Sequence, residues 1–324
     1  MNHLLIVSLS RSGGKLVRTL LDGHPECNAF PYEHWNRMSK NAIPTRRIEA
    51  FGRLTVADRM GTAGAAQAER KLRRLHAPEL VAQVMEAWRD TAGRVTSLPA
   101  MYEGLAHAYF PAVGRPAGAL VVNHCGSLSR FRREQLEAVY GPGRYLLTIR
   151  DPRAVFASMQ GLLYRKFTIK RVLKGKIPAT VLERHVEKLE TSEGVSGYAR
   201  EFCDNYRTMI ALYGASPDVI RIRFEDLVTF PEVTMRQLAE QLGICWDPTL
   251  LAPTELGVDH GPNSSFSRSG SQIHVRAADD WMGRLAPSLR VFIEKTLATE
   301  MAALGYRPLD DGGRSVLDAA PLLS

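Results

Sequence analysis

The residues best suited to chemistry lie near the start of the 324-residue chain, in the segment Ser10-Arg11-Ser12-Gly13-Gly14-Lys15. The paired glycines let backbone amides approach a ligand closely, and Arg11 and Lys15 add two full positive charges. Amides at the N-terminus of a following helix carry partial positive charge, so the arrangement favours an anion. The segment therefore predicts a loop that binds a phosphate-like ligand.

Patterned segments on both sides of this loop predict a strand and a helix. Leu4 to Val7 form an apolar run typical of a buried strand. From Lys15 to Asp22 the apolar residues fall on one face of a helix, with Arg18 and Asp22 off that face, and Gly23-His24-Pro25 ends it. Strand, tight turn and helix in this order are typical of an anion cradle.

The loop departs from the P-loop of nucleoside triphosphatases. That motif has a glycine five residues before its Gly-Lys pair and a Ser or Thr after the lysine to bind magnesium. Leu9 and Leu16 stand at these two places. The missing hydroxyl argues against kinase or ATPase chemistry, although a kinase and a plain glycine-rich turn both remain as alternatives.

A second candidate anion site follows the predicted strand Tyr145 to Ile149. Arg150 ends this strand, Asp151 can cap the next helix, and Pro152 suits the first turn of that helix. Ser158 lies eight residues after Arg150, about two helical turns along. The spacing places an arginine and a hydroxyl where both could contact one anion.

Together the two segments resemble the sulfotransferases that use 3'-phosphoadenosine 5'-phosphosulfate (PAPS). In that family a strand-loop-helix with Arg-Ser-Gly binds the 5'-phosphosulfate, and an Arg with a Ser eight residues later binds the 3'-phosphate. A third match, Ile220 to Val228 followed by Pro231-Glu232, is similar to the family's later strand and helix. The motif style is closest to the bacterial and the glycan- or tyrosylprotein-type members.

The resemblance implies an α/β fold, in which a P-loop-NTPase-like central parallel sheet is flanked by helices and enlarged by helical insertions. We expect one sulfotransferase-like domain over residues 1–309. Within it, the insertions 36–118 and 160–205 would form the acceptor side, and residues 310–324 would be a flexible tail. The length and the 45% hydrophobic content of the chain suffice for the core of such a domain.

The resemblance also implies PAPS as the donor, adenosine 3',5'-bisphosphate (PAP) as the product, and no metal. A late loop would close over the adenosine and the 3'-phosphate. Arg11 and Lys15 would also have a catalytic role, because they stabilise negative charge on the departing 5'-phosphate. The predicted cofactor-binding residues are Arg11, Ser12, Gly13, Gly14, Lys15, Arg150, Ser158, Ser265, Arg268 and Arg276.

Two residues are candidates for the base that activates the acceptor. Glu33 follows the first helix at nearly the distance at which glycan- and tyrosine-modifying members carry a catalytic Glu. His124 ends the predicted strand 119–124, where small-molecule sulfotransferases carry a catalytic His. Either could accept the proton. Glu33 could instead be a surface carboxylate, and His124 could instead donate to the sulfonate oxygens or be a hydrogen-bonded strand-end histidine without chemistry.

The implied function is transfer of a sulfuryl group from PAPS to an acceptor hydroxyl, for which we expect a carbohydrate or a small molecule. Gly14 and Lys15 replace two hydroxyl residues that are usual in the family loop, Phe224 replaces a common Tyr, and Leu162 stands where some members have another Arg. A nucleotide-binding protein of the same fold without transfer activity therefore stays open as an alternative, together with an ATP-dependent kinase.

Composition and charge indicate the kind of ligand and the cellular compartment. A net charge of +8 favours an anionic ligand. Four scattered cysteines without metal-type spacing indicate reduced thiols, and Leu4 to Val7 are too short for a signal peptide or anchor, so we expect a cytoplasmic protein. Residues 165–176 carry six basic and no acidic residues, which suits peripheral contact with a membrane or an acidic acceptor. No nucleic-acid-binding module is recognised.

Overall fold

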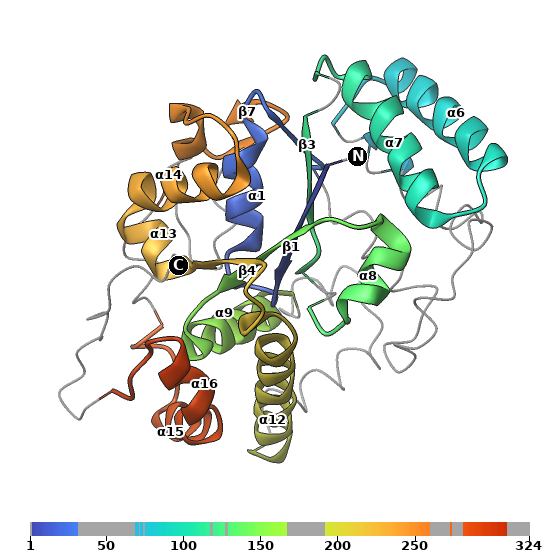
Figure 1. Ribbon diagram of the computed structural model, residues 1–324. Coiled ribbons are helices and arrows are strands. Elements are labelled where there is room, and N and C mark those ends of the chain that lie inside the picture. The colour runs from blue at the N-terminus through green and yellow to red at the C-terminus, as the bar shows by residue number, and fades with distance from the viewer. Residues whose placement is uncertain are drawn as a thin grey trace. The chain divides into compact units, whose positions relative to one another are not determined.

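The structure is a computed structural model that describes residues 2–31, 69–70, 72–73, 75–116, 119–126, 129–166, 192–259, 273 and 281–309. Seven strands are assigned in the described part of the chain (Figure 1): β1 (His3–Ser8), β2 (Cys27–Ala29), β3 (Leu120–His124), β4 (Arg144–Ile149), β5 (Val219–Arg223), β6 (Thr254–Glu255) and β7 (Val258–Asp259). The α-helices assigned there are α1 (Gly14–Asp22), α6 (Pro78–Arg94), α7 (Leu98–Ala112), α8 (Arg133–Tyr140), α9 (Pro152–Lys166), α12 (Ser192–Met209), α13 (Phe224–Thr229), α14 (Pro231–Leu242), α15 (Pro287–Thr296) and α16 (Ala298–Ala303). The π-helical turn Ile210–Gly214 and the 3-10 turn Pro248–Leu251 complete the assignment.

Five of the strands form one sheet in the order β2-β3-β1-β4-β5. β1 pairs in parallel with β3, and β2 pairs in parallel with β3 on its other side. All six residues of β1 are buried, as expected for a strand covered on both faces. The predicted α/β class, with a largely parallel sheet flanked by helices, is confirmed, and the apolar run Leu4 to Val7 is its central strand.

The chain divides into two compact units. The first unit comprises Met1–Val7, Lys15–Leu146 and Gly243–His260, and the second comprises Ser8–Gly14, Leu147–Leu242 and Gly261–Ser324. The boundaries after Val7, Gly14 and Leu146 fall inside β1, α1 and β4. The single domain expected over residues 1–309 stays a prediction.

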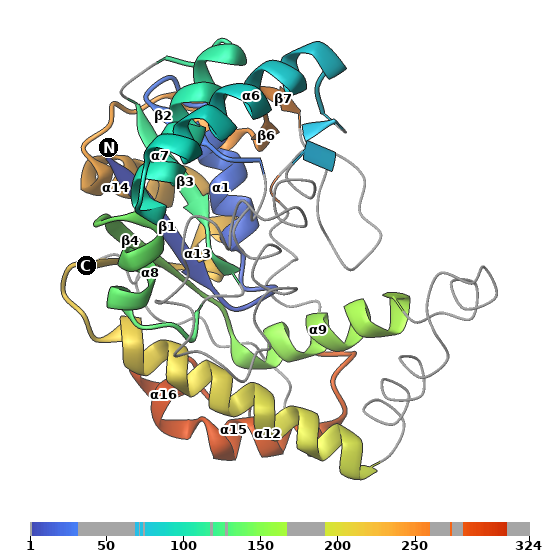
Figure 2. The same ribbon diagram turned by 90° about the vertical axis from the view of Figure 1, so that its right-hand side faces the viewer.

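In the first unit, α6 and α7 pack side by side within the segment 36–118 that was predicted as a helical insertion (Figures 1 and 2). Trp88 on α6 is fully buried, and its indole Nε1 donates to the carbonyl of Met101 on α7 at 3.2 Å. Phe30 packs its ring against Tyr102 and Phe110 with centroids 5.5 and 4.7 Å away. Aromatic burial of this kind stabilises the helix pair. That the pair lines an acceptor pocket stays a prediction.

Two charged residues of α1 are buried in the first unit, although the sequence pattern places them off the apolar face of this helix. Arg18 is 1% exposed and pairs with Glu255 at 2.9 Å, while the Asp22 carboxylate accepts from the Thr254 hydroxyl at 2.8 Å and from the Gly257 amide at 2.9 Å. These charge-assisted bonds attach the hairpin β6–β7 to α1. They fix the chain just before the segment that was predicted to close over the nucleotide.

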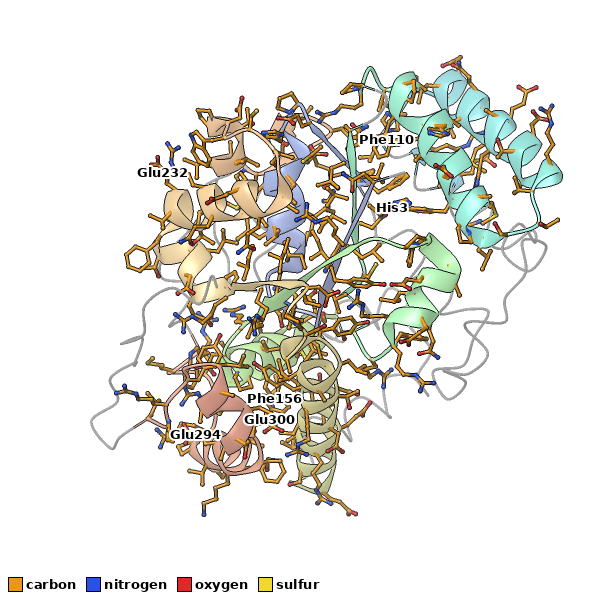
Figure 3. All side chains as sticks on the ribbon, viewed as in Figure 1. His3, Phe110, Phe156, Glu232, Glu294 and Glu300 are labelled. Atoms are coloured by element: carbon orange, nitrogen blue, oxygen red, sulfur yellow. The ribbon has the colours of Figure 1, made fainter. Side chains whose placement is uncertain are left out.

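In the second unit, α12 lies beside α15 and α16 (Figure 2). Phe156 on α9, labelled in Figure 3, packs against Phe202 of α12 with ring centroids 5.3 Å apart. Glu294 on α15 and Glu300 on α16, labelled in the same figure, bind Arg153 at 2.6 Å and Arg207 at 2.8 Å. The C-terminal helices are thus attached to α9 and α12 by ion pairs as well as by apolar packing.

Two further features are the state of the cysteines and the apolarity of the helices. All four cysteines are free thiols: three are buried, and Cys245 is exposed. Of the helices in the described residues, none combines the length and apolarity needed to cross a membrane.

Candidate anion-binding site

The loop that follows β1 is a tight turn with two unusual backbone conformations. The Ser12 amide donates to the Leu9 carbonyl at 3.1 Å, which closes the turn. Arg11 has φ of 77°, the value found at the third residue of a type II turn and normally taken by glycine. Such a conformation costs a non-glycine residue about 1–2 kcal/mol, and backbone strain of this kind clusters at functional sites.

Gly13 meets two separate requirements of the loop. Its φ is 96°, a left-handed conformation that side chains disfavour. A Cβ atom at this position would lie 2.6 Å from Cδ2 of the Phe224 ring. The loop backbone therefore packs directly against Phe224, and only glycine satisfies both conditions.

The structure brings the two predicted anion-binding segments together within the second unit. Nε of Arg11 donates to the Ser158 hydroxyl at 3.0 Å, and Nη1 of Arg150 donates to the Arg11 carbonyl at 3.0 Å. Ser158 and Arg150 are 2% and 7% exposed. The strained loop residue Arg11 is thus bonded to both residues of the second motif.

Phe224 supports Arg150 as well as Gly13. The guanidinium carbon of Arg150 lies over the Phe224 ring, 4.2 Å from its centroid. Cation–π attraction to the ring helps to hold the planar guanidinium in one orientation. The sequence marked Phe224 only as a departure from the family pattern, whereas the structure makes it the support of the site.

The loop also carries a buried polar atom suited to a ligand. The Ser12 side chain is fully buried, and its hydroxyl has no hydrogen-bond partner among the residues that the structure describes. A buried hydroxyl without a partner costs about 1–3 kcal/mol, which a bound anion would offset. Gly14 begins α1, and Lys15, its second residue, is half-buried. The loop therefore fits an anionic group.

The peptide group between Arg150 and Asp151 is held from both sides. The Tyr206 hydroxyl donates to the Arg150 carbonyl at 3.0 Å, and the Asp151 amide donates to Oε1 of Glu225 at 3.0 Å. The Asp151 carboxylate caps α9, as predicted, by accepting from the Arg153 amide at 2.8 Å, and it also binds the Arg153 guanidinium at 2.7 Å. Buried hydrogen bonds therefore fix the backbone that carries Arg150.

Glu225 is a buried carboxyl with a strongly perturbed acidity. Burial, followed by the nearby charge of Asp151, raises its pKa from 4.5 to about 7. The charge of Arg150 and the hydrogen bonds from the Asp151 amide and the Tyr306 hydroxyl oppose this rise in the pKa. The net direction shows that desolvation outweighs these favourable contacts.

We expect Glu225→Gln to change how the free energy of unfolding depends on pH. A carboxyl with a raised pKa binds more protons in the folded state than in the unfolded state. Its contribution to the stability of the folded state is therefore complete below pH 4.5 and is lost as the pH rises through about 7. Between these pKa values the loss amounts to about 3 kcal/mol, at about 1.4 kcal/mol per pH unit. Glutamine does not titrate, so the free energy of unfolding of the variant should rise by about this much relative to that of wild type as the pH rises.

Urea unfolding of both proteins between about pH 4.5 and pH 8 measures this difference. Glu232→Gln, on the exposed part of α14, is the control. A difference between Glu225→Gln and wild type that stays constant over the whole range would contradict the raised pKa.

The remaining predicted site residues lie elsewhere or outside the described part of the chain. His124 ends β3 in the first unit, is 9% exposed, and pairs in register with Ile6 of β1. Its role as a base stays a prediction. Glu33, Ser265, Arg268 and Arg276, as well as the side chains of the basic segment 165–176 and the tail 310–324, lie outside the described residues.

Sequence reasoning missed four residues around Arg150: Tyr206, Phe224 as a support, Glu225 and Tyr306. A signal for Glu225 existed, because Glu225 and Asp226 lie two and three residues after Arg223, the last residue of β5. Acidic residues close to the end of a strand often belong to a site at the carboxyl edge of a parallel sheet. Tyr206 and Tyr306 carried no such signal, since a tyrosine in a helix or near the chain end is compatible with simple packing.

Comparisons with known proteins agree with this fold. The profile of the sulfotransferase family matches residues 3–248. The solved sulfotransferase domain from the curacin biosynthetic pathway is 18% identical with a TM-score of 0.52, covering 92% of this chain and 97% of that chain. The sulfotransferase domain from the Synechococcus PCC 7002 olefin synthase is 18% identical with a TM-score of 0.53, covering 92% and 94%. Identities this low show the shared fold alone. No curated protein matches the chain.

Proposed function

We propose that this chain, which belongs to the sulfotransferase family, transfers the sulfuryl group of PAPS to a hydroxyl of a carbohydrate or small molecule. One observation carries the proposal. The loop residue Arg11 is hydrogen-bonded both to Ser158 and, through its carbonyl, to Arg150, so the two segments predicted to bind anions are in direct contact. PAPS has one anionic group at each end of its ribose, and a joined pair of anion-binding elements suits such a nucleotide.

The described residues fit this donor. Ser12 has a buried hydroxyl with no partner in the described part of the chain, and Gly13 supplies the left-handed φ of 96° that the loop requires. The amides of residues 12–14 with Arg11 and Lys15 would hold the 5'-phosphosulfate, and Arg150 with Ser158 would hold the 3'-phosphate. Charge-assisted hydrogen bonds of this kind contribute roughly 1.5–3 kcal/mol each.

Bound PAPS supplies the sulfuryl group, and the residues of the chain supply the rest of the chemistry. The acceptor hydroxyl oxygen forms a bond to sulfur while the bond from sulfur to the 5'-phosphate oxygen breaks. Arg11 and Lys15 stabilise the negative charge that develops on that phosphate. Glu33 or His124 takes the proton of the acceptor hydroxyl. These two bases remain alternatives within the proposal.

Two further points of the proposal concern acceptor and compartment. Two solved domains with a similar fold belong to a biosynthetic pathway and to an olefin synthase, which supports keeping small molecules beside carbohydrates as acceptors. Four free thiols support the reducing cytoplasm as the compartment. Peripheral contact of residues 165–176 with a membrane or an acidic acceptor is part of the same proposal.

Calorimetry with PAP and with ATP tests the choice of nucleotide. We expect wild type to bind PAP without magnesium and to bind ATP at least about 10-fold more weakly, because ATP lacks the 3'-phosphate that Arg150 would hold. Tighter binding of ATP in the presence of magnesium would instead favour a kinase. Binding of PAP with no turnover of radiolabelled PAPS on a panel of phenols, alcohols and sugars would favour the nucleotide-binding protein without transfer.

A further inference from the structure

We propose that Glu225 and Tyr306 are positioning residues for the 3'-phosphate site, because they hold the peptide group that carries Arg150. The inference rests on the function proposed above, in which Arg150 binds the 3'-phosphate. Neither residue is assigned a contact with the nucleotide. Both act through the backbone between Arg150 and Asp151.

The first step of the argument is the restraint on this peptide group. Its carbonyl accepts from Tyr206 on α12, and its amide donates to Glu225 on α13, each at 3.0 Å. The peptide cannot rotate without breaking two buried hydrogen bonds. Since the Arg150 side chain leaves the backbone at this peptide, the two bonds fix the direction in which it starts.

The second step concerns the charge of Arg150. The adjacent carboxylate, Asp151, is engaged by Arg153, whose guanidinium also binds Glu294 at 2.6 Å and lies 4.8 Å from the centroid of the Trp281 ring. Arg150 instead donates to the Arg11 carbonyl and rests on Phe224. A guanidinium oriented by such contacts can form a charge-assisted hydrogen bond to an anionic ligand.

The third step is the anchor of Glu225 itself. Oε2 of Glu225 accepts from the Tyr306 hydroxyl at 2.8 Å, and Tyr306 is 3% exposed. The Tyr306 amide donates to the Met301 carbonyl of α16 at 2.8 Å. The family profile ends at residue 248, so Tyr306 brings a segment beyond the matched region to the site. The C-terminal helices thereby help to set the geometry of the nucleotide site.

The test compares PAP with adenosine 5'-phosphate, which lacks the 3'-phosphate, by calorimetry on the full chain. Wild type should prefer PAP clearly. In Tyr306→Phe this preference should fall roughly 3- to 10-fold, the effect of one lost hydrogen bond, while the affinity for adenosine 5'-phosphate stays unchanged. Tyr206→Phe, which releases the other side of the peptide, should give the same selective loss.

Tyr109→Phe is the matched control, since it removes a buried tyrosine hydroxyl that bonds His76 at 3.1 Å in the first unit. This control should keep the full preference for PAP. Equal losses for both nucleotides in Tyr306→Phe, or an unchanged preference in both Tyr306→Phe and Tyr206→Phe, would overturn the positioning role alone. A wild type with no preference for PAP would overturn the proposed function and this inference with it.

Discussion

Replacing Arg150 by alanine is expected to weaken the binding of PAP at least about 100-fold, which corresponds to two lost charge-assisted hydrogen bonds at roughly 1.5–3 kcal/mol each. Arg150 is 7% exposed, lies over the Phe224 ring and donates to the Arg11 carbonyl. A buried, oriented guanidinium binds a phosphate more strongly than an exposed arginine does, because water screens it less. The variant should also lose its preference for PAP over adenosine 5'-phosphate.

Calorimetry without magnesium measures this loss of affinity. Two further variants serve as an intermediate case and as a control. Arg150→Lys keeps the charge but not the planar group that stacks on Phe224, so we expect an intermediate affinity. Arg236→Ala removes an exposed arginine that pairs with Glu232 on α14 and should leave PAP binding within about 2-fold of wild type. Nucleotide binding by Arg150→Ala at the wild-type level would refute the assignment of the 3'-phosphate to this residue.

Gly13→Ala is expected to destabilise the protein by about 3 to 5 kcal/mol and to abolish nucleotide binding. Alanine at φ of 96° is strained, and its Cβ would lie 2.6 Å from the Phe224 ring. The ring also supports Arg150, so moving it would disturb the anion site as well as the loop. Urea unfolding and calorimetry together measure both consequences.

Two control variants separate the causes of this loss. Gly243→Ala has a comparable φ of 66° but no atom within 4 Å of the added Cβ, so it should show only the backbone strain, about 1–2 kcal/mol. In the background of Phe224→Ala, Gly13→Ala should cost less than in wild type, because the clashing ring is gone. Equal costs in the two backgrounds would show that the close packing of Gly13 on Phe224 is not what requires glycine.

Much of the local structure around the site follows from short-range patterns in the sequence. The apolar run Leu4 to Val7 became the buried central strand, Gly13 took a left-handed φ in the loop that follows it, and Asp151-Pro152 began α9 as a cap and a first helical residue. These features are predictable because each depends on neighbours within a few residues: hydrophobic periodicity, the φ range of glycine, and the hydrogen bond of a capping carboxylate.

Residue types alone did not reveal which charged residues would be buried. Arg18 and Asp22 lie off the apolar face of α1, yet both are 1% exposed, because Glu255, Thr254 and the Gly257 amide supply their partners. A buried charge is tolerated only where partners are available. Those partners lie more than 230 positions away along the chain, beyond the reach of any local pattern.

The sequence by itself determined the glycine-containing loop after β1, the spacing of Arg150 and Ser158, and the strands and helices that carry them. Only the tertiary structure decided that Arg11 bonds both members of that pair, that Phe224 supports Arg150 and packs on Gly13, and that Tyr206 and Glu225 hold the peptide beside Arg150. The physical reason is that local propensities act over one or two turns of backbone. Hydrogen bonds between residues 56 to 147 positions apart exist only after the chain has packed.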